Sequence, residues 1–218
     1  GTIPTEIANL INLEILRLRG AFTGFLPLEI WALSKLQRIY IHSEIEQLEG
    51  SLPAQVFAEE GNKFQEIDLH YTKFSNGLPT TIGNLTALKQ LVLFGNKAIR
   101  GIIPTEIGLC TKLTTLTLNR IGLEETIPQE IGDLSNLNRL SIAENCLTGT
   151  IPDSFSQLTQ LEYLDLYSWK KIRLNTVSFD GQFPIEICEL PSLKTIKLAC
   201  ISEAYQSCPE SCCLCETV

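Results

Sequence analysis

Cysteine is the residue type that most clearly suggests chemistry in this 218-residue chain. Six of the eight cysteines fall between positions 188 and 218: Cys188, Cys200, Cys208, Cys212, Cys213 and Cys215. An even number of cysteines in one short segment favours disulfide bonds, whose connectivity the sequence does not determine. Four thiolates could instead bind zinc, although adjacent cysteines are unlike the separated pairs of common zinc sites. Disulfides, a zinc site and free thiols are therefore the three alternatives for this tail.

The composition limits what the rest of the chain can be. Apolar residues make up 44% of the sequence, which is enough to build a large core and argues against disorder. The formal net charge of -8 argues against nucleic acid or an anionic membrane as the main partner. No apolar run reaches the roughly 18 residues that a membrane-spanning helix needs.

A repeated motif organises residues 1–200. A proline that follows an apolar residue recurs about every 24 residues, a spacing in the range of known solenoid repeats. These prolines are Pro4, Pro27, Pro53, Pro79, Pro104, Pro128, Pro152 and Pro184. The clearest copy spans 128–152, PQEIGDLSNLNRLSIAENCLTGTIP, and has apolar residues at Ile131, Leu134, Leu137, Leu140, Ile142 and Leu147. This spacing is the leucine-rich repeat signature.

The spacing also predicts how the copies stack. In each L-x-L stretch the two apolar side chains point inward and the residue between them points outward, as in a β-strand. One such strand cannot bury its apolar face alone, so the copies must stack into a parallel sheet over a continuous core. We expect an α/β leucine-rich repeat solenoid of about eight repeats. Insertions at 58–63 and 168–180 are expected to form loops.

Two segments, NLTALKQLVLFGN at 84–96 and the copy at 128–152, resemble the plant-type extracellular leucine-rich repeats of receptor-kinase ectodomains and polygalacturonase-inhibiting proteins. The resemblance implies a second short strand near each G-x-I-P segment and short 3-10 or helical turns after each proline on the convex side. It also implies a ladder of asparagines that close the strands. That slot holds Ala21, Glu44, Thr72, Asn96, Ile121, Asn145, Trp169 and Ile201, so the ladder is expected to be mostly absent.

The same resemblance favours disulfides for the tail and an extracellular location, either secreted or on the cell surface. The spacing from Cys200 to Cys208 is similar to that of the paired cysteines that cap such solenoids. A disulfide-rich cap over residues 188–218, overlapping the last repeat, would cover the apolar end of the core. Asn84, in the sequon Asn84-Leu85-Thr86, is the candidate for N-glycosylation.

The outward-facing strand residues should form columns on the concave face of the sheet. In the N-terminal half these columns bring together aromatic and basic residues, the types that make good binding anchors. The candidate ligand-binding residues are Arg17, Arg19, Arg38, Tyr40, His42, Asp68, His70, Tyr71 and Phe94. We refer to these nine residues as the concave patch.

His42 and His70 are the only histidines in the chain, and they fall in the same column of adjacent repeats. Their Cβ atoms should therefore lie about 5 Å apart. A metal site would need a third ligand with suitable geometry. The sequence does not assure one, although Asp68 is on the same strand as His70, and we expect stacked surface histidines without a metal.

The sequence predicts a binding protein with no catalytic residues and no cofactor, since none of the common catalytic or nucleotide-binding motifs is present. The interpretation that fits best is an extracellular recognition module whose concave face binds a protein, peptide or glycan. One alternative is a structural subunit of an extracellular matrix or large surface assembly, and another is an inhibitor of a secreted polysaccharide hydrolase. No capping segment precedes Leu10 and Leu13, so we also expect further N-terminal repeats or a partner to cover that end.

Overall fold

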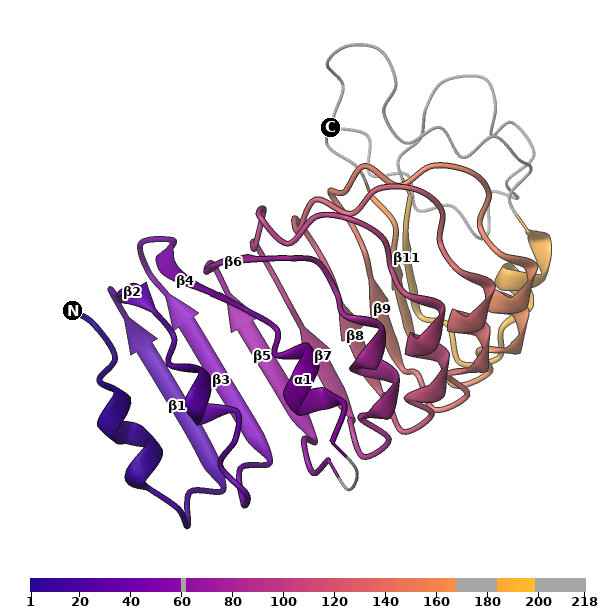
Figure 1. Ribbon diagram of the computed structural model, residues 1–218. Helices are drawn as coiled ribbons and strands as arrows, with labels where there is room; N and C mark the ends of the chain where they lie inside the picture. Colours follow the sequence, from indigo (N-terminus) through magenta and orange to yellow (C-terminus); the bar gives the residue numbers. More distant parts are fainter. Residues whose placement is uncertain (60–61, 168–183, 199–218) are drawn as a thin grey trace.

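The computed structural model describes residues 1–59, 62–167 and 184–198, which form one curved solenoid (Figure 1). Its main sheet is parallel and, within these residues, has eight strands, one from each proline-anchored segment. They are β1 (Ile15–Gly20), β3 (Arg38–Ser43), β5 (Glu66–His70), β7 (Gln90–Val92), β8 (Thr115–Thr117), β9 (Arg139–Ser141), β10 (Tyr163–Asp165) and β11 (Thr195–Lys197). Their order in the sheet follows the chain. The predicted solenoid with a parallel sheet is therefore confirmed.

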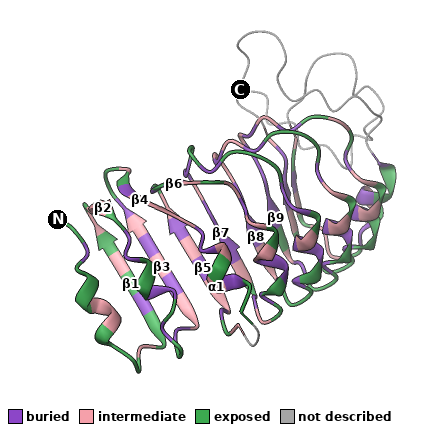
Figure 2. Ribbon diagram, in the orientation of Figure 1, coloured by how far each residue is buried: buried purple, intermediate pink, exposed green. Residues whose placement is uncertain are grey.

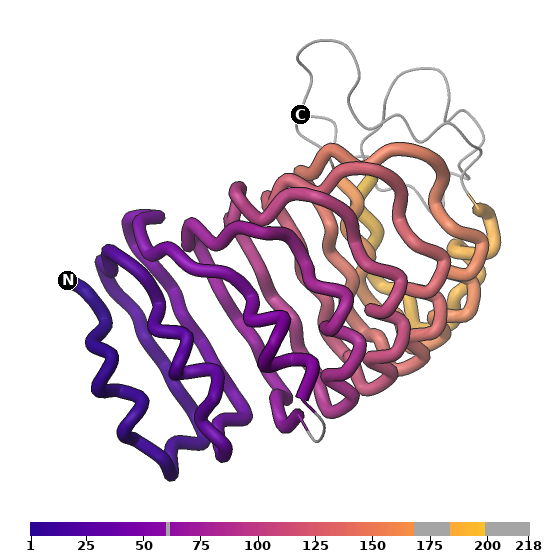
Figure 3. Tube along the Cα trace, viewed as in Figure 1, coloured from indigo at the N-terminus to yellow at the C-terminus, as the bar shows by residue number. Residues whose placement is uncertain are grey.

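Short helical turns line the side opposite this sheet, and consecutive turns of the chain lie side by side along the solenoid (Figure 3). Those in the described ranges comprise one α-helix, α1 (Ala54–Phe57), and seven 3-10 helices: η1 (Thr5–Asn9), η2 (Leu28–Ile30), η3 (Thr80–Asn84), η4 (Thr105–Leu109), η5 (Gln129–Asp133), η6 (Asp153–Gln157) and η7 (Ile185–Glu189). Each begins directly after one of the repeat prolines, whose fixed φ suits the residue before a helix. In the part of the chain described here, no helix is long and apolar enough to cross a membrane.

A second, smaller sheet lies beside the first in the N-terminal repeats. It contains β2 (Thr23–Phe25), β4 (Gln47–Ser51) and β6 (Lys73–Ser75), paired in parallel. Further along the chain, the same position is reduced to single bridges between Gly101 and Leu123 and between Thr126 and Thr148. Among the residues that the structure describes, the short strand that the family resemblance implied is thus continuous in the first repeats only.

The hydrophobic core runs without a break from Ile3 to Ile196 (Figure 2). All six apolar positions of the repeat at 128–152 are buried, at most 3% exposed, as the spacing predicted. The second and third repeats instead fill the core with three rings, Trp31, Phe57 and Phe64, whose centroids lie 5.7–5.9 Å apart in edge-to-face contact. Edge-to-face packing is a favoured aromatic geometry, so bulkier residues replace leucine here without disrupting the stack.

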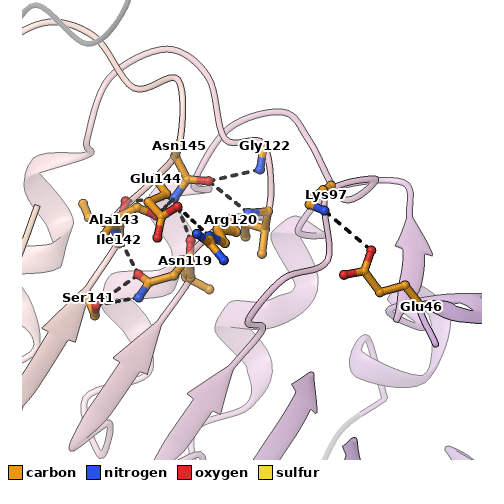
Figure 4. Close-up of polar contacts among 12 residues, drawn as sticks. Glu46, Lys97, Asn119, Arg120, Gly122, Ser141, Ile142, Ala143, Glu144 and Asn145 are labelled. Carbon is orange, nitrogen blue, oxygen red and sulfur yellow. Dashed lines mark hydrogen bonds and ion pairs between the residues drawn. The ribbon is translucent and has the colours of Figure 1, made fainter. Parts of the chain in front are cut away.

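Two asparagines of the predicted ladder slot bind the backbone of the preceding repeat. The Asn145 Oδ1 atom accepts hydrogen bonds from the N–H groups of Ile121, Gly122 and Leu123 at 3.1, 3.0 and 3.2 Å (Figure 4). Its Nδ2 atom donates to the Leu118 and Ile142 carbonyls at 2.7 and 2.8 Å. Asn96 likewise accepts from the Thr72 N–H at 3.0 Å and donates to the Leu69 carbonyl at 2.8 Å. Both side chains are buried, so each satisfies backbone groups that water cannot reach.

The two ends of the solenoid differ in what the described residues show. Cys188 takes part in a disulfide bond, but Cys200, Cys208, Cys212, Cys213 and Cys215 lie outside the described residues, as does the insertion at 168–180. The disulfide-rich cap therefore stays a prediction. At the other end Leu10, Ile11, Ile15, Phe25 and Leu28 are exposed large apolar side chains. The idea that further repeats or a partner cover them also stays a prediction.

Candidate functional site

The pairing register of the main sheet lines up the concave patch residues in columns. Arg17 of β1 lies opposite Tyr40 of β3, and Tyr40 lies opposite Asp68 of β5. In the neighbouring column Arg19 pairs with His42, and His42 pairs with His70. The apolar residues between these positions are largely buried on the other side of the sheet. The alternation therefore presents the patch side chains to solvent on one surface.

Arg17, Arg38, Tyr40 and Glu66 form one group on this surface. The Arg17 guanidinium lies 4.8 Å from the centroid of the Tyr40 ring, in a cation–π contact. The Tyr40 hydroxyl donates a hydrogen bond to the Glu66 carboxylate, and Arg38 Nε lies 3.4 Å from the same carboxylate. Partial burial, and then the hydrogen bond to Glu66, raise the pKa of Tyr40 above its ordinary value. The phenol is therefore held neutral and in a fixed orientation.

His42, Asp68 and His70 form a second group. The Asp68 Oδ1 atom lies 3.1 Å from His42 Nε2 and 2.8 Å from His70 Nε2, so one carboxylate oxygen bridges both imidazoles. The Asp68 side chain is 13% exposed, compared with 44% for His42 and 27% for His70. The acid is thus the recessed member of the group, and both imidazole rings reach the solvent.

A row of rings extends this second group along the sheet. The His42 and His70 rings lie 4.2 Å apart between centroids, and His70 and Phe94 lie 5.6 Å apart, each pair tilted by 31°. Tyr71 packs edge-on against Phe94 at 5.2 Å. Tyr71 has a left-handed backbone, φ 53°, and its ring covers Gly95, where an added Cβ would lie 2.6 Å from Tyr71 Cδ1. Gly95, itself at φ 75°, is the residue that leaves room for this ring.

Side chains in the C-terminal half of the concave face are more buried than those in the N-terminal half. The first column continues with Val92, Thr117, Ser141 and Asp165, which are all buried, at most 9% exposed. Side-chain hydrogen bonds join this column to its neighbours, including Asn119 Nδ2 to Ser141 Oγ at 2.8 Å. Figure 4 shows this network beside two ion pairs, Arg120–Glu144 at 2.5 Å and Lys97–Glu46 at 3.5 Å. The polar groups of this half are thus mostly engaged with each other.

The structure therefore places eight of the nine predicted residues in two connected groups. One contains Arg17, Arg38 and Tyr40, and the other contains His42, Asp68, His70, Tyr71 and Phe94. Arg19 is exposed in the column of His42. The predicted set did not include Glu66, which contacts both Tyr40 and Arg38. Its position opposite Arg38 in an outward-facing column could have indicated this contact. Asn84, the candidate glycosylation site, is exposed at the end of η3.

Residues 67–216 match the family model described as a leucine-rich repeat region. This chain belongs to the leucine-rich repeat family. A comparison with curated protein sequences gives no match.

Several solved structures share the fold, and three of them are receptors or contain one. The LRR ectodomain of the membrane receptor kinase GASSHO1/SCHENGEN3 from Arabidopsis thaliana, in complex with CASPARIAN STRIP INTEGRITY FACTOR 2, is 29% identical with a TM-score of 0.72 and covers 91% of this chain. The Arabidopsis receptor kinase HAESA, in complex with the peptide hormone IDA and the co-receptor SERK1, is 25% identical with a TM-score of 0.77 and also covers 91%. A TDR receptor is 28% identical with a TM-score of 0.75 and covers 90%.

This leucine-rich repeat chain is much shorter than those neighbours. It covers 23% of the GASSHO1/SCHENGEN3 chain, 31% of the HAESA chain and 32% of the TDR chain. The similarity is therefore to a stretch of repeats within a longer solenoid.

Proposed function

We propose that this chain is an extracellular recognition module that binds a peptide or protein segment across the N-terminal half of its concave face. The observation that carries the proposal is the pre-arranged concave patch. Its arginines and aromatic rings reach the solvent, while hydrogen bonds and ring packing hold several of them in one orientation. Side chains that are ordered before binding lose less conformational entropy when a ligand arrives.

The chemistry of the patch favours a peptide with both apolar and acidic groups. The rings of Tyr40, Tyr71 and Phe94 offer faces and edges for apolar side chains. Arg17 and Arg19 are exposed and offer guanidinium groups for carboxylates. One structural neighbour, HAESA, is in complex with the peptide hormone IDA, which supports the same class of ligand. A glycan could use the aromatic faces but would leave the two arginines without an anionic partner.

Selection from a random peptide display library against the immobilised chain would test this proposal. Enriched peptides would be titrated against wild type and against the triple variant Tyr40→Ala, His70→Ala, Phe94→Ala. A matched control, Leu28→Ala, Leu109→Ala, Ile185→Ala, removes three exposed apolar side chains from the convex helices. We expect the concave variant to lose at least about 30-fold in affinity, since a single binding hot spot contributes about 2 kcal/mol or more. Equal affinity of the concave variant and wild type would refute the concave site.

A pulldown from a native extracellular fraction would address the two other functions. A soluble peptide or receptor among the captured partners would support recognition. A cross-linked insoluble partner would point to a structural subunit, and a polysaccharide hydrolase would point to inhibition. Thermal unfolding followed by circular dichroism would verify that each variant remains folded.

A further inference from the structure

We propose that His42, Asp68 and His70 bind one divalent transition-metal ion. Their potential ligand atoms all lie within 4.8 Å of one another, and the two Nε2 atoms face the same carboxylate oxygen. This inference goes beyond the proposed function and does not depend on it, because the ion would bind whether or not a peptide is present.

The geometry needs only small adjustments to accept an ion. Metal–ligand bonds of about 2.0–2.1 Å in a tetrahedral site place the ligand atoms about 3.3 Å apart. The two Asp68–imidazole separations, 2.8 and 3.1 Å, are already close to this value. All separations between ligand atoms are within 4.8 Å, so none has to shorten by more than about 1.5 Å to reach the tetrahedral spacing. His42, with 44% of its side chain exposed, has the space for such a movement.

The surroundings hold the ligands in place. Phe94 packs against the His70 ring, and Tyr71 contacts both Phe94 and His70 edge-on. The recessed Asp68 sits between the imidazoles, and its negative charge favours a cation at this point. Arg19, which pairs with His42 in the sheet, opposes a cation, but it is exposed and its charge is screened by water.

The donor set indicates which ions would bind. Imidazole nitrogens favour Zn²⁺, Ni²⁺ and Cu²⁺, whereas Mg²⁺ and Ca²⁺ prefer oxygen ligands. Two histidines and one carboxylate supply three ligands, so at least one coordination position would remain open toward the concave face. That position could accept water or a donor atom from a bound ligand, which would make the ion part of the recognition surface.

The test uses the full chain, with accessible thiols blocked by N-ethylmaleimide so that cysteines do not bind the ion. Zn²⁺ would be titrated by calorimetry, and the imidazole ¹⁵N signals would be followed by NMR. Because the chain contains 2 histidines, every imidazole signal reports on this site. We expect one equivalent of Zn²⁺ to shift both histidines, and Co²⁺ to give a spectrum without thiolate charge-transfer bands.

Two variants make the result decisive. Asp68→Asn removes one ligand, and Asp133→Asn, an exposed residue at the end of η5, makes the same change in charge elsewhere. We expect Asp68→Asn to lower the association constant about a hundredfold, since loss of even an outer-shell partner costs about 10- to 100-fold. Asp133→Asn should bind as wild type does. Histidine signals that do not move at one equivalent, or equal Zn²⁺ affinity in Asp68→Asn and wild type, would overturn the proposal.

Discussion

Replacing Asn145 with alanine would remove a side chain that bonds two consecutive repeats together. Its Oδ1 atom accepts from three backbone N–H groups, and those of Ile121 and Leu123 belong to buried residues. A buried donor left without an acceptor costs about 1–3 kcal/mol, so the two together cost about 2–6 kcal/mol. Loss of the hydrogen bonds that Nδ2 donates costs less free energy, because a carbonyl oxygen has two lone pairs and can accept a hydrogen bond from another donor. We therefore expect Asn145→Ala to lower the free energy of unfolding by about 4 kcal/mol.

Urea unfolding followed by circular dichroism would measure this loss. Because a repeat protein can open locally before it unfolds as a whole, hydrogen exchange should also be measured at the amides of residues 121–123. The matched control is Asn136→Ala, since Asn136 is exposed and donates one side-chain hydrogen bond to the Thr111 carbonyl at 2.8 Å. The control should lose less than about 1 kcal/mol. If Asn145→Ala lost no more than the control and the amides of 121–123 stayed protected, the structural role assigned to Asn145 would be wrong.

Three further predictions concern single positions. Gly95→Ala should destabilise the fold by about 1–2 kcal/mol through its left-handed φ alone, and near-ultraviolet circular dichroism should show that the ring of Tyr71 has moved. Burial raises the pKa of the Cys110 thiol to about 12, so this thiol should react with a disulfide reagent only on unfolding. The folded pKa lies above the unfolded value of 9.0, so the stability that Cys110 contributes is complete below pH 9 and falls as the pH rises toward 12. Glu66→Gln should lower the pKa of Tyr40 toward its ordinary value, as ¹³C NMR of labelled tyrosine would detect, and an unchanged titration would show that burial alone raises it.

The repeat spacing was sufficient to predict the solenoid and its sheet. Because side chains alternate along a strand, the L-x-L pattern at 140–142 assigned Leu140 and Ile142 to the core, where both are buried. The same alternation placed Arg17 beside Tyr40 and His42 beside His70, and the pairing register agrees with both. Regularity of this kind is predictable because every copy has to fit onto its neighbours.

The contacts within the site were less predictable. Asp68 pairs in the sheet with Tyr40, not with His42, and reaches the two imidazoles diagonally and along its own strand. Diagonal contacts depend on which rotamer each side chain adopts, and the spacing of the repeats does not specify this. The same reason explains why Glu66 was not expected to join Tyr40 to Arg38. The fit of the Tyr71 ring over Gly95 also required the backbone angles of both residues.

The unequal burial of the concave face has a consequence for protein engineering. In β7 to β10 the last residues of the strands, Val92, Thr117, Ser141 and Asp165, are buried, so a new side chain there would disturb the packing or the hydrogen bonds of its neighbours. In β1 and β3 the corresponding Arg17 and Tyr40 reach the solvent. A randomised library aimed at new ligands should therefore vary the outward-facing residues of β1, β3 and β5 and leave those of β7 to β10 unchanged. Such a library would keep most of its members folded, because the supporting half of the solenoid would be the same in all of them.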